Sequence, residues 1–110
     1  MRLVTSLGLA LLLLSFTPHS IANDFYQIPI PADAKEFARL DNKMPAVLSF
    51  FSKQSESALH DYYIQQLGQP DSTQVNYGRE HLYFSVNGNR VRILISSRDD
   101  WRQVDIMVQN

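Results

Sequence analysis

The chain has 110 residues, with 10 basic and 11 acidic side chains and no cysteine. The missing thiols exclude disulfide bonds, a CxxC redox site, a thiolate nucleophile, a lipobox-type lipid anchor and any zinc site built on cysteine. The near-neutral charge gives no electrostatic footprint for nucleic acid or for an anionic membrane surface.

The first 22 residues have the features of a secretory signal peptide. Arg2 gives a short positive region, and an apolar run of 14 residues extends from Leu3 to Phe16. Small residues follow at Ser20 and Ala22, which predicts cleavage after Ala22. An uncleaved anchor is the alternative, but the run is shorter than the ~20 residues that a bilayer span needs. We therefore expect no stable membrane span after cleavage.

Residues 23–110 would then form a single exported domain of 88 residues with a formal charge of −2. Small exported domains in strongly oxidising compartments usually carry disulfides. A cysteine-free exported domain therefore indicates a bacterial cell envelope. We expect a periplasmic or secreted protein.

The segment before the first clear strand gives weak signals. Pro29 and Pro31 alternate with isoleucines and favour an extended path. Residues 34–40 (AKEFARL) fit either a turn or two of helix or a short edge strand, and their periodicity does not separate the two. Composition predicts a loop over 41–45.

A short apolar run and a complete helix follow. Residues 46–52 (AVLSFFS) have the length and composition of a buried strand. Ser55 is a good N-cap, and Gly68 with Pro70 beyond it ends the helix. The sequence therefore predicts a helix over 55–68.

The apolar side chains of this helix form one stripe. Leu59, Tyr63 and Leu67 recur every four residues, with Tyr62 beside them. An amphipathic helix needs an apolar surface to cover, and the strands that follow supply one.

After Pro70 the apolar period changes from that of a helix to two. Residues 73–77 alternate weakly, and 81–87, 90–96 and 101–109 alternate cleanly. We predict turns at 78–80 and 97–100, and a hairpin at 87–89 whose central pair is either Asn87-Gly88 or Gly88-Asn89. The predicted inward residues are Leu82, Phe84, Val86, Val91, Ile93, Ile95, Val104, Ile106 and Val108.

These elements predict an α+β fold. One main amphipathic helix would pack on a mainly antiparallel sheet of about four to five strands, in the chain order β-α-β-β-β-β.

No motif for catalysis, a metal or a cofactor stands out. His60 and His81 lack a second ligand at helical spacing, and we expect both to be solvated. Asp99 and Asp100, with Asp105, are the only acidic cluster, and turn chemistry accounts for the first two. We therefore expect a non-catalytic protein without a cofactor, and a small hydrolase is the least favoured alternative.

The outer face of the predicted meander carries an unusual set of side chains. Tyr83, Leu94 and Met107 point away from the helix, with Arg90, Arg92 and Gln103 near them. Large apolar groups rimmed by arginine are typical of a contact patch. Two alternatives stay open. The N-terminal segment with Phe25, Tyr26, Ile28 and Ile30 could cover this face, or the exposed apolar residues could be ordinary.

Two further features bear on partner binding. Trp101 is either a binding hot spot or a plug at the edge of the core. An open edge strand could accept a partner strand. The candidate partner-binding residues are Tyr83, Arg92, Leu94, Met107 and Trp101.

The sequence favours a small binding or protein-interaction module of the cell envelope, whose partner is another envelope protein. An inhibitor or immunity protein for an exported enzyme is the alternative. That function would use an exposed acidic or aromatic loop, and residues 99–101 (DDW) are the candidate.

Overall fold

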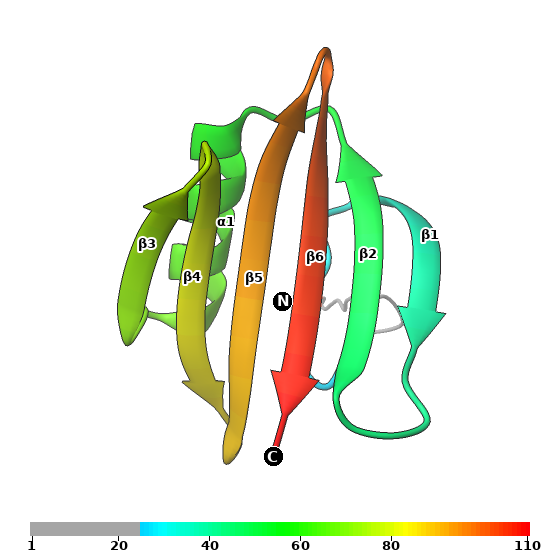
Figure 1. Ribbon diagram of the computed structural model, residues 1–110, viewed down its shortest axis with the longest axis vertical. Helices are drawn as coiled ribbons and strands as arrows, with labels where there is room; N and C mark the ends of the chain where they lie inside the picture. The colour runs from blue at the N-terminus through cyan, green and yellow to red at the C-terminus, as the bar shows by residue number, and fades with distance from the viewer. Residues whose placement is uncertain (1–24) are drawn as a thin grey trace, which may run out of the picture.

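The computed structural model describes residues 25–110, so the predicted signal peptide and its cleavage site lie outside the described residues. Six strands form one antiparallel sheet in the order β1-β2-β6-β5-β4-β3, with one helix packed behind it (Figure 1). The elements are β1 Lys35–Leu40, β2 Ala46–Ser52, α1 Glu56–Leu67, β3 Ser72–Asn76, β4 Arg79–Val86, β5 Asn89–Arg98 and β6 Trp101–Gln109.

The predicted α+β class with an antiparallel sheet is confirmed. The prediction of four to five strands in the order β-α-β-β-β-β was wrong, because there are six strands and two of them precede the helix. Within residues 25–110 no helix has the length and apolar character that a membrane span requires.

The additional strand is β1, which lies in the segment whose sequence fits either a short helix or an edge strand. It pairs antiparallel with β2, and the register shifts between Glu36 and Ala38, which leaves Phe37 in a bulge. All six residues of β1 are exposed. With no buried face to impose an alternation of apolar and polar residues, the strand carries no clear period of two.

The hairpin turns are tighter than the sequence predicted. Tyr77-Gly78 and Asn87-Gly88 each join two strands with both residues at positive φ. Such turns match the right-handed twist of a hairpin. The predicted turn at 78–80 was therefore wrong, because residues 79 and 80 belong to β4, and the hairpin at 87–89 uses Asn87-Gly88. In the same way β5 extends to Arg98, so that the last turn consists of Asp99 and Asp100 alone.

Helix α1 has the ends that the sequence predicted. The Ser55 hydroxyl accepts a hydrogen bond from the backbone N–H of Ala58 at 3.0 Å. Gly68, at φ 89°, donates its N–H to the carbonyl of Ile64 at 2.8 Å. Between the caps, Leu59 and Tyr63 are buried against the sheet.

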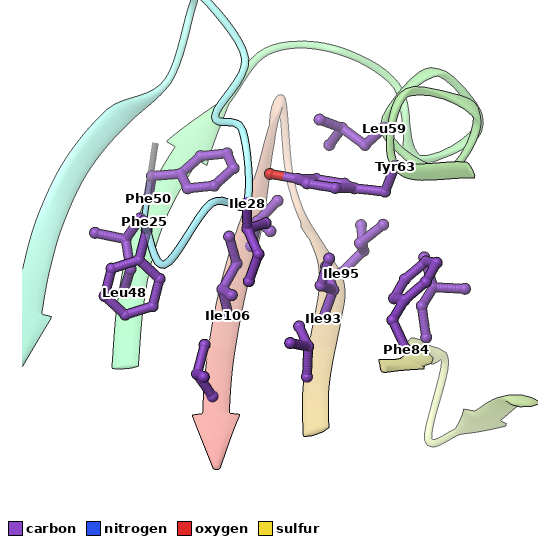
Figure 2. Close-up of a cluster of buried hydrophobic side chains, with 14 of the residues drawn as sticks. Phe25, Ile28, Leu48, Phe50, Leu59, Tyr63, Phe84, Ile93, Ile95 and Ile106 are labelled. Atoms are coloured by element: carbon purple, nitrogen blue, oxygen red, sulfur yellow. The ribbon is translucent and has the colours of Figure 1, made fainter. Parts of the chain in front are cut away.

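The hydrophobic core lies between the sheet and α1, and Tyr63 extends from α1 toward Ile28 within it (Figure 2). Its side chain is fully buried, and its hydroxyl donates to the carbonyl of Pro29 at 3.1 Å. Burial raises the pKa of Tyr63, as does the neighbouring Tyr62, so the hydroxyl stays protonated and can donate. The predicted inward residues of β4, β5 and β6 are buried here, and Val86 packs against them half-buried.

The N-terminal segment closes the same side of the sheet as the helix. Phe25 and Ile28 are buried and exchange two backbone hydrogen bonds of 2.9 Å. Both belong to the buried cluster that fills the space between the sheet and α1 (Figure 2). The alternative in which this segment covers the outer face is therefore wrong for Phe25 and Ile28.

Asp33 fastens this segment to the end of β2. Its carboxylate accepts hydrogen bonds from the Ser52 hydroxyl at 2.9 Å, the Lys53 N–H at 3.0 Å and the Gln54 side chain at 2.9 Å. Partial burial raises the pKa of Asp33, but the hydrogen bonds from Gln54, Lys53 and Ser52 together outweigh it and hold that pKa below its ordinary value.

We expect Asp33→Asn to lower the free energy of unfolding at pH 7 by about 1 kcal/mol, a value that allows for solvent screening of an exposed carboxylate. A lowered folded-state pKa stabilises the fold above the ordinary carboxyl pKa of about 3.9, and this contribution disappears as pH falls through the folded-state value. Urea denaturation from pH 7 to pH 2 should therefore show the two proteins converging in acid.

The matched control is Asp61→Asn, since Asp61 is an exposed helix carboxylate for which no side-chain hydrogen bond is present within residues 25–110. It should change stability by less than about 0.5 kcal/mol at either pH. A constant difference between Asp33→Asn and the native protein across this pH range would refute the role given to the carboxylate charge.

Candidate functional site: the outer face of the sheet

The outer face of the sheet is the side opposite α1, and it faces the viewer in Figure 1. The helix and the N-terminal segment both lie behind the sheet, and no element of residues 25–110 lies in front of it. The outer positions of β4, β5 and β6 alternate with the buried ones, and most of them are half-buried or exposed. Within the described residues, this face is therefore open to a partner over its whole width.

Four of the five candidate residues meet at the middle of this face. Tyr83, Arg92 and Met107 are directly opposite one another on β4, β5 and β6. A guanidinium nitrogen of Arg92 lies 3.8 Å from the Met107 sulfur. Leu94 is in the next row, one residue pair along the same face and about 7 Å away. We call these four residues the central patch.

Trp101 is also on the outer face, but it lies apart from the central patch in an aromatic cluster. Phe51 lies between the rings of Phe37 and Trp101, with ring centroids 4.5 Å and 5.9 Å away. The Lys53 ammonium lies 4.7 Å from the centre of the Trp101 ring. These contacts half-bury Trp101 at the start of β6, on the face opposite the hydrophobic core.

A polar link separates the aromatic cluster from the central patch. Asp105 accepts a hydrogen bond of 2.6 Å from Ser49 and one of 3.1 Å from Gln103. These bonds join the outer sides of β2 and β6 and satisfy the one carboxylate on this part of the face. Asp105 is therefore held in place by its own neighbours.

The structure adds two arginines that the sequence had assigned to turns. Arg79 and Arg98 occupy outer positions, because β4 and β5 are longer than predicted. Together with Arg90 and Arg92 they place four guanidinium groups on β4 and β5. Asp105 is the one acidic residue at an outer position of β4, β5 and β6, each of which the structure describes in full.

Three acidic side chains lie on the side of the sheet that α1 covers. Glu56 and Asp61 belong to α1, and Glu80 points toward α1 from β4. On the outer face, Asp71, Asp99 and Asp105 partly offset the charge of the four arginines. The sequence already indicated two of these arginines, because Arg90 and Arg92 are two residues apart on a strand and therefore point to the same face.

Two shallow hollows lie on the outer face, one at each end of β5. The first has a volume of about 290 Å³ and is lined by Asp71, Tyr83, Phe84, Ser85, Arg90, Val91, Arg92, Met107 and Gln109. The second has a volume of about 540 Å³, is more polar, and contains Arg79, Arg98, Asp99 and Asp105. The first joins apolar side chains of the central patch to two of the arginines.

Both histidines were predicted to be solvated, but both are half-buried. The Nδ1 atom of His60 lies 2.6 Å from a carboxylate oxygen of Glu80, which links α1 to β4. His81 stacks on Tyr83 with ring centroids 6.3 Å apart, and its Nδ1 atom is buried without a hydrogen-bond partner in residues 25–110. Both side chains are half-buried because each packs against the neighbouring element.

The remaining acidic candidates do not converge. Asp99 and Asp100 form the exposed turn between β5 and β6, while Asp105 is bonded to Ser49 and Gln103 on the face of the sheet. In the described part of the chain no three histidine or acidic side chains gather as a metal site would require.

No known protein family, curated protein or solved structure matches this chain. The function is therefore inferred from the geometry of the outer face.

Proposed function

We propose that this protein is an exported, periplasmic binding module that recognises another protein of the cell envelope through the outer face of its sheet. The module acts without catalysis and without a cofactor. Its contact surface is the central patch of Tyr83, Arg92, Leu94 and Met107.

The observation that carries this proposal is that no element of residues 25–110 covers the outer face, while the core is already closed on the inner face. The helix and the N-terminal segment both cover the inner face, so Tyr83, Leu94 and Met107 remain half-exposed without a described element over them. Tyrosine, methionine and arginine are the residue types enriched in protein interfaces.

The double variant Tyr83→Ser and Leu94→Ser tests the proposal. Both side chains are outside the core, so we expect the far-ultraviolet circular dichroism spectrum to stay unchanged and the melting temperature to fall by only a few degrees. In a pull-down from an envelope extract, we expect the partner bound by the native protein to be reduced at least tenfold, as for hot-spot residues.

Val75→Ser is the matched control, because Val75 is 72% exposed but lies on the edge strand β3, away from the central patch. It should bind the partner as well as the native protein. If the double variant keeps its fold and retains every partner, the outer face is not the binding surface.

A further inference from the structure

We propose that the first hollow binds a carboxylate of the partner, so that the partner presents an acidic segment to the outer face. This inference rests on the proposed function and names the chemistry of the partner surface that the central patch would meet.

Arg90 and Arg92 supply the positive charge of the first hollow. They are two residues apart on β5, point to the same face, and both line the hollow. Within residues 25–110 neither guanidinium forms an ion pair, whereas Arg39 pairs with both Glu36 and Asp41. Unpaired guanidinium groups in a concave site provide forked donors that match a carboxylate.

Tyr83 and Met107 supply apolar surface in the same hollow. A glutamate side chain would place its methylene groups against the Tyr83 ring and the Met107 thioether while its carboxylate reached the arginines. The Gln109 amide and the Ser85 hydroxyl add neutral polar groups at the rim. This combination fits an acidic protein segment better than a bare inorganic anion.

The one acidic residue in the hollow limits the charge of the ligand. Asp71 accepts a hydrogen bond of 2.8 Å from the Ser85 hydroxyl, and its carboxylate repels any anion that enters. The repulsion is smaller for a carboxylate with one charge than for a phosphate with nearly two. The hollow therefore favours carboxylate over phosphate.

The test uses the mature protein and a fluorescent hexaglutamate peptide, with a hexaglutamine peptide as the neutral control, measured by fluorescence anisotropy at low salt. We expect hexaglutamate to bind and hexaglutamine not to bind. Arg92→Gln should weaken hexaglutamate binding at least tenfold, and Asp71→Asn should strengthen it several-fold, because it removes the repelling charge while keeping an oxygen for Ser85.

Arg98→Gln is the matched control, since Arg98 has the same charge, strand and face but lines the second hollow about 20 Å from Arg92. Its effect should be less than twofold. An equal loss in Arg98→Gln and Arg92→Gln would overturn the proposal in favour of diffuse attraction.

Two other results would also overturn the carboxylate site. One is stronger competition by inorganic phosphate than by glutamate at equal concentration, and the other is binding to anionic phospholipid vesicles without binding to hexaglutamate. If hexaglutamate does not bind while the partner is still lost from the Tyr83→Ser and Leu94→Ser variant, this inference fails and the proposed function stands.

Discussion

Replacing Tyr63 with alanine should lower the free energy of unfolding by about 3–5 kcal/mol, the usual cost of removing a large buried aromatic ring. The ring is fully buried between α1, the sheet and the N-terminal segment, so its loss opens a cavity that three elements must close at once (Figure 2). Guanidinium denaturation followed by circular dichroism measures the change.

Two companion variants separate the contributions of Tyr63. Tyr63→Phe removes only the hydroxyl that donates to Pro29, and it should cost about 1–2 kcal/mol because the carbonyl loses its partner. Tyr62→Ala removes a half-buried ring whose centroid is 4.9 Å from that of Tyr63, and it should cost less than Tyr63→Ala. Equal effects of Tyr62→Ala and Tyr63→Ala would contradict the conclusion that the fully buried Tyr63 ring stabilises the fold more than the half-buried Tyr62 ring.

The second large effect is expected at Ile28, in the segment that the sequence could not assign to either face. Ile28→Ala should destabilise the protein by about 2–5 kcal/mol, because its side chain is fully buried beside Tyr63. The loss should appear as a lower denaturation midpoint with an unchanged slope, since the folded state keeps its architecture.

Ile30→Ala is the control for this variant, because Ile30 is only half-buried against the same cluster. It should cost clearly less than Ile28→Ala. Binding of the partner should survive in both variants, since neither residue reaches the outer face. A wild-type midpoint for Ile28→Ala would show that the segment does not complete the core.

The sequence predicted the parts of the fold that carry strong local signals. The helix was recognised from Ser55 and Gly68, whose capping bonds are present, and the last strand from the alternation of Val104, Ile106 and Val108. In these elements one face is buried, so apolar residues recur with the period of the helix or strand, and this recurrence is visible in the sequence.

The missed features are those that long-range contacts decide. β1 has no buried face and becomes a strand only through its pairing with β2. Tyr77 was not expected at positive φ, a backbone conformation that favours glycine and asparagine, so the turn was placed one residue too late. The side that the N-terminal segment covers depends on distant contacts, such as the hydrogen bond from the Tyr63 hydroxyl to the Pro29 carbonyl 34 residues away.

The sequence predicted only those parts of the candidate site that follow from the alternation of a strand. Tyr83, Arg92, Leu94 and Met107 follow from strand alternation, and the structure brings them together. Trp101 was grouped with them, although its place at the end of β6 puts it in a separate cluster with Phe51. Arg79 and Arg98 were missed as outer residues, because the sequence assigned them to turns.

The most direct test of the outer face is site-specific photocrosslinking in the cells that produce the protein. A photoreactive amino acid at Leu94 lies in the central patch, and one at Gln66 lies exposed on α1, on the opposite side of the sheet. We predict one discrete adduct with another envelope protein from position 94 and none from position 66. Adducts from position 66 alone would contradict the assignment of the outer face as the binding surface.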